Sequence, residues 1–373
     1  MRKLKRAAFT LWSKCNGSCG YCYNKDRKQK QLQLHDREKI SVSEFEKILN
    51  QAVALGLEDI QISGGEPLLE PEEVIEMVKL SKDSGVHIGI FTNGSLLNQD
   101  IIERLYNIQL DWIRIGIGGY DFKTHSLERG GTPERFDNIV KAIKASINRG
   151  LKTRLFVPIT KNTFPFIEKT CDFIAKEFHG LDHVVFDSYI PNGVPEKDRK
   201  FQMSPEEHYT AIGSLLKARR KHKIKIIPYY GCFEFLSSEW NGENVLKSPC
   251  GKERLAFLSN GDITPCLCTL DVLGNFREKD FNLKEIVDNL SYFAHYDYSS
   301  HAPCSDCSKY DLCRDAWCPS LTVNARGNYN RPPATCPAVR EYEALLQDGI
   351  SKKIAIRESL KHNLKGDQNE GLS

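Results

Sequence analysis

The sequence lacks the features of an exported or membrane-inserted protein. No apolar run approaches the roughly 18 residues that a membrane-spanning helix needs. The N-terminal stretch MRKLKRAAFTLWSKC has no apolar core long enough for a secretory signal. The formal net charge of only +3 over 373 residues is too weak to indicate binding to nucleic acid or to a membrane surface. We therefore expect a cytoplasmic protein whose partners include neither nucleic acid nor membrane.

Cysteine, by contrast, is abundant, with 13 residues in the chain. Disulfides are rare in proteins without an export signal, so metal binding or catalysis is the expected use of these thiols. Three cysteines lie within the first 22 residues and nine lie beyond residue 230. Since 373 residues exceed what one small core organises, this uneven distribution favours two domains.

Between residue 7 and about residue 230, short apolar runs alternate with amphipathic stretches. Strands are predicted at 8–12, 59–63, 86–91, 112–117, 153–159 and 183–189. Helices are predicted at 43–55, 71–83, 98–106, 134–148, 164–178 and 205–220. Ser43 with Glu46, and Ser204 with Glu207, have the spacing of capping boxes. Such strand–helix units predict an α/β fold with a parallel sheet, but periodicity does not say whether the sheet is open or a barrel.

The pattern changes after residue 230. Helices become shorter, and Asn260 with Gly261 predicts the turn of a β-hairpin. We predict an α/β domain at 1–230, a small cysteine-rich domain at 231–345, and a C-terminal helix with a polar tail at 346–373. A small region that buries little apolar surface is expected to be organised by metal ligation.

The segment SKCNGSCGYCYN at 13–24 places Cys15, Cys19 and Cys22 within eight residues. A closed zinc site uses four ligands and a redox Cys-x-x-Cys pair uses two, whereas three leave one coordination position open. Gly17 and Gly20 permit a tight bend, and the segment follows the first strand at the edge where α/β proteins bind ligands. A surface redox motif or a partial zinc site is the simpler interpretation of the same residues.

This loop resembles the cluster-binding loop of radical S-adenosylmethionine (SAM) enzymes, in which three cysteines bind a [4Fe–4S] cluster and an aromatic residue precedes the third. Cys15, Cys19 and Cys22 match the ligands, and Tyr21 matches the aromatic residue. The resemblance covers about residues 7–220 and implies a partial (β/α)6 barrel similar to a TIM barrel. It also implies that SAM binds the fourth iron and is cleaved by one electron to methionine and a 5′-deoxyadenosyl radical. That electron would come from an external donor such as flavodoxin or ferredoxin.

Further segments match this family in order along the chain. ISGGEP at 62–67 resembles the segment that hydrogen-bonds the SAM amino group, and FTNGSLL at 91–97 resembles the ribose-contact region. With Tyr21, the residues that the resemblance assigns to SAM are Ser63, Gly64, Gly65, Glu66, Thr92, Asn93 and Arg129.

The fourth strand departs from the family pattern. Gly116 and Gly118 stand where the family often has serine and aspartate, so the polar contacts of those residues are missing or moved. Arg129 matches the arginine that meets the SAM carboxylate, and the alternative is a solvated arginine on a loop.

The C-terminal cysteines resemble those of the SPASM extension of radical SAM enzymes, which carries two auxiliary [4Fe–4S] clusters, so three clusters are expected in all. The resemblance implies an outer set of Cys304, Cys307, Cys313 and Cys336, and an inner set of Cys250, Cys266 and Cys318. The inner set needs a fourth ligand, for which Cys232, Cys268 or an iron left open to substrate are the candidates.

One spacing differs from the SPASM pattern, because four residues rather than three separate Cys313 from Cys318. A zinc site is therefore the alternative for the cysteines between 304 and 318. Cys171 lies in a predicted helix among apolar residues and is expected to be a core residue.

The resemblance implies hydrogen abstraction by an oxidoreductase but not the product. We expect modification of a peptide or protein by cross-linking, thioether formation, epimerisation or oxidation, with no catalytic acid or base assigned. The alternative is oxidation of a small molecule such as a sugar or aminocyclitol. A remote alternative, a non-catalytic iron–sulfur electron carrier, would not need Gly-Gly-Glu-Pro or Arg129.

Two details refine this expectation. Cys15 leaves no room before it for a leader-binding domain, so a separate leader-peptide-binding protein is a candidate partner. Leu267 stands where protein-sulfatase maturases tend to have an aspartate base, which argues against that reaction.

Overall fold

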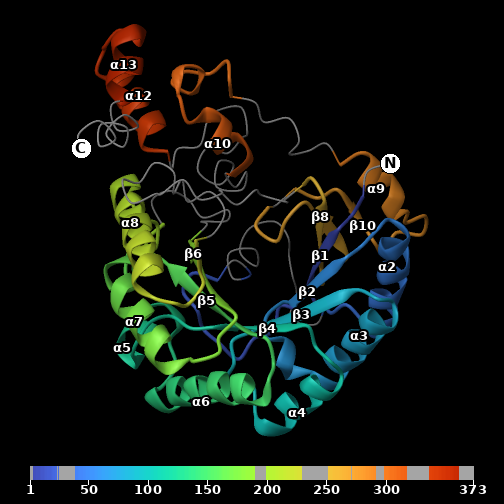
Figure 1. Cartoon of the computed structure of the whole chain (residues 1–373). Helices are drawn as coiled ribbons and strands as arrows, with labels where there is room; N and C mark the ends of the chain where they lie inside the picture. Colours follow the sequence, from blue (N-terminus) through green and yellow to red (C-terminus); the bar gives the residue numbers. More distant parts are fainter. Residues whose placement is uncertain are drawn as a thin grey trace.

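The computed structural model describes residues 3–22, 24, 38–189, 199–228, 251–269, 271–290, 298–316 and 336–360. These residues contain one ten-stranded sheet in the order β10-β9-β8-β1-β2-β3-β4-β5-β6-β7. The sheet curves, with helices covering its outer side, and Figure 1 shows this partial barrel with α2 to α8 around it. The expected α/β partial barrel is confirmed.

The strands are β1 (Arg6–Thr10), β2 (Asp59–Ser63), β3 (His87–Thr92), β4 (Trp112–Gly116), β5 (Thr153–Ile159), β6 (His183–Ser188), β7 (Ile226–Pro228), β8 (Arg254–Leu258), β9 (Asp262–Thr264) and β10 (Gly274–Asn275). The barrel helices are α2 (Val42–Ala54), α3 (Pro71–Asp83), α4 (Gln99–Asn107), α5 (Phe122–Arg129), α6 (Pro133–Arg149), α7 (Ile167–Glu177) and α8 (Pro205–Lys221). The later helices are α9 (Leu283–Asp288), α10 (Tyr310–Ala316), α12 (Pro337–Gln347) and α13 (Lys352–Ser359). Neighbouring strands from β1 to β7 are parallel.

Local sequence signals explain most of these boundaries. The capping box of Ser204 and Glu207 is confirmed at the start of α8. The box expected from Ser43 and Glu46 is wrong, because Ser41 caps α2 and Glu44 reaches back to its N–H. Helix α5 was not expected. It is short, and Asp121 caps it by accepting a hydrogen bond from the N–H of Thr124.

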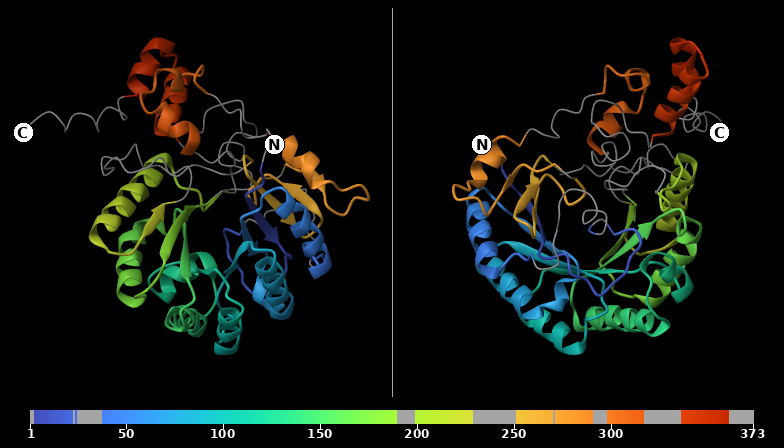
Figure 2. Two further views of the ribbon diagram at one scale, coloured as in Figure 1. Left: turned by 45° about the vertical axis from the view of Figure 1, so that its right-hand side comes forward. Right: turned by 180° about the vertical axis from the view of Figure 1, so that it is seen from behind.

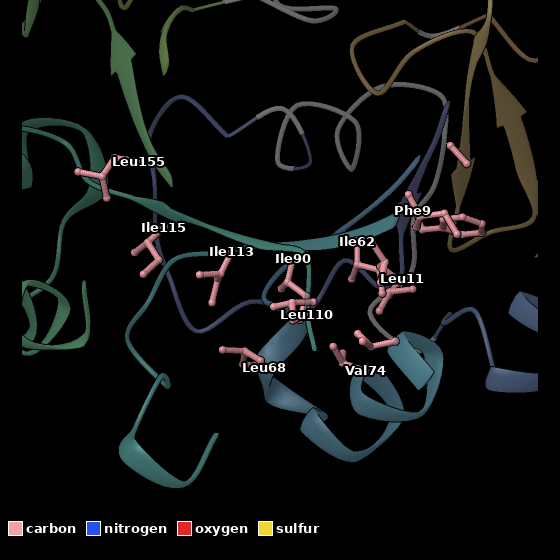
Figure 3. Close-up of a cluster of buried hydrophobic side chains, with 14 of the residues drawn as sticks. Phe9, Leu11, Ile62, Leu68, Val74, Ile90, Leu110, Ile113, Ile115 and Leu155 are labelled. Carbon is pink, nitrogen blue, oxygen red and sulfur yellow. The ribbon is translucent and has the colours of Figure 1, made fainter. Parts of the chain in front are cut away.

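The main core lies between the sheet and the outer helices. Alternate residues of the strands point to this side, among them Phe9, Ile62, Ile90 and Ile113, all 0% exposed. Figure 3 shows such side chains on one side of the strands, facing Val74 of α3. Because side chains alternate across a strand, the opposite face supplies the barrel interior.

The sheet extends beyond the six expected strands. Strand β8 pairs in parallel with β1, and Phe9 stacks on Phe257 with ring centroids 4.9 Å apart. The hairpin predicted at Asn260 and Gly261 is confirmed, since β8 and β9 pair antiparallel and Gly261 has φ of +94°. Residues 254–275 therefore belong to the same sheet as the barrel strands, although they lie beyond the predicted boundary at 231.

The later elements contact the barrel at a second place. The guanidinium of Arg277 donates to Glu44 of α2 at 2.7 Å, and the N–H of Leu283 donates to Gln51 at 2.9 Å. Helices α10, α12 and α13 lie away from the outer helices, above the opening of the curved sheet (Figure 2). Among the described helices, none is long and apolar enough to cross a membrane.

Candidate functional site

The loop that follows β1 carries three thiols at the carboxyl ends of the parallel strands. Cys15 is exposed, Cys19 and Cys22 are partly buried, and all three are free of disulfides. The N–H of Gly20 donates to the carbonyl of Glu128 at 2.8 Å, which ties the loop to α5. The side chain of Phe201 packs on Gly20, where a Cβ would lie only 2.5 Å from the ring. Glycine at this position therefore allows the Phe201 ring to approach the loop closely, a contact that was not predicted from the sequence.

A polar network braces the outer side of this loop. The side-chain amide of Asn93, after β3, donates to Asn16 at 2.9 Å and lies 3.9 Å from the sulfur of Cys15. Arg135 of α6 donates to the Asn16 carbonyl at 2.8 Å, and Ser95 donates to Asn93 at 2.6 Å. The segment after β3 and the first turn of α6 thus hold the loop in one place. The sequence analysis identified only Asn93 among these residues.

The Gly-Gly-Glu segment lies directly against the cysteine loop. The N–H of Gly65 donates to the Trp12 carbonyl at 2.6 Å, and the N–H of Glu66 donates to the Lys14 carbonyl at 3.0 Å. A Cβ on Gly65 would overlap the Lys14 carbonyl, and one on Gly64 would lie 2.8 Å from the Trp12 oxygen. The two glycines are thus required by the approach of the loop's own backbone.

Glu66 is fully buried, and both of its carboxylate oxygens accept hydrogen bonds within the protein. The donors are the Thr92 hydroxyl at 2.6 Å, the Asn93 N–H at 2.7 Å and the Leu68 N–H at 3.0 Å. Burial raises the pKa of Glu66, opposed by these hydrogen bonds. The carboxylate thereby fixes the ends of β2 and β3 beside the cysteine loop.

Ser63 is similarly engaged, since its hydroxyl donates to the Phe9 carbonyl at 3.1 Å. Contacts of Ser63, Gly64, Gly65, Glu66, Thr92 and Asn93 with SAM remain predictions.

Arg129, at the end of α5, fills the space left by Gly116. A Cβ on Gly116 would lie 2.6 Å from both terminal nitrogens of the guanidinium, and one on Gly118 would lie 3.3 Å from Arg129 Cδ. Nη1 of Arg129 donates to the phenolic oxygen of Tyr21 at 2.6 Å. The guanidinium is therefore packed against β4 and the cysteine loop, while its contact with the SAM carboxylate stays a prediction.

The guanidinium is the central positive charge of this region. Burial lowers the pKa of Arg129, but its interactions with Tyr21, Cys19 and Cys15 outweigh that effect and raise the pKa overall. Arg129 also contributes to lowering the pKa of His125, to about 3, although burial is the larger cause. The structure thus brings one fixed cation to two of the thiols of the loop.

Four C-terminal cysteines also gather. Cys304, Cys307, Cys313 and Cys336 interact electrostatically with one another, although Cys336 lies in a different segment. Burial raises the pKa of the Cys304 thiol to about 12 and that of Cys336 to about 11. Within the described residues, no three His, Cys, Asp or Glu side chains lie close enough to hold a single metal ion.

The predicted inner set is only partly described. Cys266 is buried, and its sulfur accepts a hydrogen bond from the N–H of Cys268 at 3.5 Å. The other candidate ligands, Cys232, Cys250 and Cys318, lie outside the described residues. Cys171 is fully buried in the core, as expected.

Cys266 follows β9, yet it interacts electrostatically with Asp187 at the end of β6. These strands lie near opposite edges of the sheet, so the sheet curls far enough to bring the two ends together across the opening. Burial raises the pKa of Asp187 well above its usual value, opposed by Arg114 of β4. Neither Asp187 nor Arg114 was predicted as a site residue from the sequence, because only curvature of the sheet brings Asp187 near Cys266.

Comparison with known proteins agrees with this geometry. Residues 10–174 match the family model of the Radical SAM superfamily. The chain carries a radical SAM domain. It is therefore an enzyme that uses SAM and a [4Fe–4S] cluster, as members of this superfamily do. The matched residues run from the last residue of β1 into α7 and include the cysteine loop and strands β2 to β5.

Curated relatives have diverse names. The AdoMet-dependent heme synthase of Methanosarcina barkeri is 23% identical over 348 residues, which cover 88% of this chain and 95% of the relative. The S-adenosylmethionine-dependent nucleotide dehydratase of a Thermoplasmatales archaeon is 25% identical and covers 56% of this chain and 74% of the relative.

Solved structures share the fold over most of the chain. Native anSMEcpe with bound AdoMet superposes with a TM-score of 0.72 over 98% of this chain and 97% of the other, at 14% identity. Streptococcus suis SuiB bound to its precursor peptide SuiA gives a TM-score of 0.64 over 87% of this chain and 74% of the other, at 19% identity.

The site residues fit a cluster with bound SAM. Three thiols without disulfides lie on one braced loop, and the guanidinium of Arg129, which donates to Tyr21, lies beside them. Thiolates are the usual protein ligands of a [4Fe–4S] cluster, and an arginine is suited to the carboxylate of SAM.

Proposed function

We propose that this enzyme modifies a peptide or protein in the cytoplasm, by cross-linking, thioether formation, epimerisation or oxidation. The observation that carries the proposal is the extent of the fold likeness. A superposition over 98% of the chain includes most of the described residues after 251, and anSMEcpe and SuiB were solved with bound peptides. Those residues shape the opening of the barrel, where a substrate would enter.

In this proposal Cys15, Cys19 and Cys22 hold the first cluster, and Arg129 receives the SAM carboxylate. When bound, the cluster and SAM supply a 5′-deoxyadenosyl radical that abstracts a hydrogen atom from the substrate. The protein holds the loop rigid through Gly65 and Asn93. In this proposal the enzyme takes the electron for SAM cleavage from an external donor such as flavodoxin or ferredoxin.

We further propose that residues 231–345 form a SPASM domain with two auxiliary clusters. The gathering of Cys304, Cys307, Cys313 and Cys336 from two segments supports an outer cluster. Cys266, beside Asp187, supports an inner cluster next to the barrel opening. The inner cluster would then lie nearer to the substrate than the outer cluster, and it would be the first acceptor of an electron released when the substrate is oxidised.

The test combines metal analysis with a variant. Anaerobically reconstituted protein should contain about 12 iron and about 12 sulfide per chain, as three [4Fe–4S] clusters require. The double variant Cys304→Ala with Cys307→Ala should still form 5′-deoxyadenosine in the absence of substrate but should stop product formation. Circular dichroism must first match wild type, and any new protease cleavage must be confined to residues 298–316, so that the barrel is known to be intact. Zinc with a single iron–sulfur cluster would refute the SPASM assignment.

A second candidate, modification of a small molecule, is supported by the curated relatives. The heme synthase aligns over nearly its whole length and is named for a product that is not a peptide. The two candidates are separated by deuterium transfer. Deuterated peptide encoded next to the gene, or a deuterated sugar, is incubated with the enzyme, and the deuterium content of 5′-deoxyadenosine is measured by mass spectrometry. Label from the peptide alone supports peptide modification, and label from the sugar alone supports the second candidate.

A further inference from the structure

The region around Arg129 contains a second polar group suited to the same ligand. Tyr21 and Arg129 lie 108 residues apart in sequence, yet the phenolic oxygen accepts a hydrogen bond from Nη1 at 2.6 Å. Because the oxygen acts as acceptor here, the phenolic proton is left to donate elsewhere. Among the described residues, no carbonyl or side chain accepts a hydrogen bond from the Tyr21 hydroxyl.

The guanidinium is similarly underused. An arginine has five N–H donors. Within the described part of the chain, Arg129 donates one hydrogen bond, to the hydroxyl of Tyr21. Arg129 and Tyr21 are both partly buried, so water only partly compensates for the remaining donors. The pair therefore offers donors of two kinds from one fixed point beside Cys15 and Cys19.

Gly116 explains why the pair has this geometry. The guanidinium lies against the strand where any larger residue would displace it, since a Cβ on Gly116 would be 2.6 Å from its terminal nitrogens. Gly20 precedes Tyr21 and Glu128 precedes Arg129, and the N–H of Gly20 donates to the carbonyl of Glu128 at 2.8 Å. Tyr21 and Arg129 are thus fixed relative to each other from two sides.

We propose that Tyr21 and Arg129 form a two-donor clamp for the carboxylate of SAM, in which the Tyr21 hydroxyl both positions the arginine and donates its own proton to a carboxylate oxygen. This assigns the Tyr21 hydroxyl a role separate from that of its ring. The clamp takes the place of the polar side chains that Gly116 and Gly118 lack. It does not depend on which substrate the enzyme modifies.

The test measures binding of two ligands to the reconstituted, unreduced enzyme, so that no turnover occurs. The ligands are SAM and decarboxylated SAM, which lacks the carboxylate. In Tyr21→Phe, SAM should bind about tenfold more weakly, as loss of a charge-assisted hydrogen bond implies, while the affinity for decarboxylated SAM stays unchanged. The matched control is Tyr106→Phe, because Tyr106 also contacts an arginine, Arg149, but on the outer helices.

Two results would overturn the clamp. Equal weakening of both ligands would mean that Tyr21 acts through its ring or through the shape of the loop, and unchanged affinity for both would mean that the hydroxyl does nothing. Iron content equal to wild type is required before the comparison is made. If Tyr21→Phe loses iron, Gly116→Ala replaces it, since this change moves the guanidinium away from the Tyr21 hydroxyl without substituting a residue of the loop, and it should cause the same selective loss. Because no substrate is present, failure of the proposed function leaves the result intact.

Discussion

The two cysteine-bearing regions differ in what holds the thiols together. The first loop is anchored by the backbone of Gly65 and Glu66, by Asn93 and by Arg135. Its surroundings are a continuous apolar core. The C-terminal thiols instead lie on short elements such as the 3-10 turn Cys304–Asp306 and α10, where Leu312 is 38% exposed. We therefore expect the protein's own contacts to hold the first loop, and metal ligation to organise the C-terminal region.

The two cysteine-bearing regions should differ most clearly in how they respond to loss of their cysteines. The triple variant Cys15→Ala, Cys19→Ala, Cys22→Ala should abolish SAM cleavage and lose about four irons, yet keep its unfolding temperature, because the braces around the loop remain. Cys304→Ala with Cys307→Ala should also lose about four irons, but with new protease cleavage between 298 and 316. Iron assays, SAM cleavage assays and limited proteolysis measure these outcomes. Equal protease resistance of the two variants would contradict the comparison.

Strand β8 lies beyond the predicted domain boundary at 231, yet it pairs with β1. Phe257 of β8 is fully buried and stacks on Phe9, so we expect β8 to fold as part of the barrel. Phe257→Ala should lower the free energy of unfolding by about 3–5 kcal/mol, because a large cavity forms next to β1. The matched control is Leu346→Ala in α12, 40% exposed, which should cost less than about 0.5 kcal/mol. Urea unfolding with and without iron measures the free energy of unfolding of both variants. A small effect of Phe257→Ala would mean that β8 does not fold as part of the barrel.

The close contact between the cysteine loop and the Gly-Gly-Glu segment predicts a smaller, local effect. Gly65→Ala should force the Lys14 backbone away and reduce iron occupancy of the first cluster, at a cost of about 1–3 kcal/mol for the overpacked contact. Gly17→Ala is the matched control in the same loop, since its Cβ would make only ordinary contacts, the nearest 3.5 Å from the Cys15 sulfur. Iron content after reconstitution is the measurement. Equal iron content in the two variants would mean that the loop tolerates the shift.

The sequence predicted strands β1 to β6 and most of the barrel helices well, because local apolar periodicity encodes them. The pairing of β8 with β1 could not be predicted from local sequence, since it joins residues nearly 250 positions apart, such as Phe9 and Phe257. Helix α5 was missed because it is short and polar, and its residues are fixed by Gly116, Gly118 and Tyr21 rather than by their own pattern.

In the site, the residue types were predicted better than their contacts. The sequence identified Gly64 and Gly65 as points of close approach to the cofactor, whereas the structure shows them in close approach to Trp12 and Lys14. Arg135 was not predicted, because nothing in its local sequence distinguishes it from a solvated helix residue. Such contacts depend on the curvature of the sheet, which periodicity does not determine.

The smallest effect is expected from the brace on the exposed side of the loop. Arg135 donates to the Asn16 carbonyl at 2.8 Å and to the Ser95 hydroxyl at 3.3 Å, both near the surface, where a hydrogen bond contributes about 0.5–1.5 kcal/mol. Arg135→Ala should therefore keep full iron content but release iron to a chelator several-fold faster than wild type. Arg104→Ala is the control, because it removes surface ion pairs with Glu72 and Asp100 that lie away from the loop. Iron release at the wild-type rate from Arg135→Ala would mean that the inner contacts of Gly65 and Glu66 hold the loop without help.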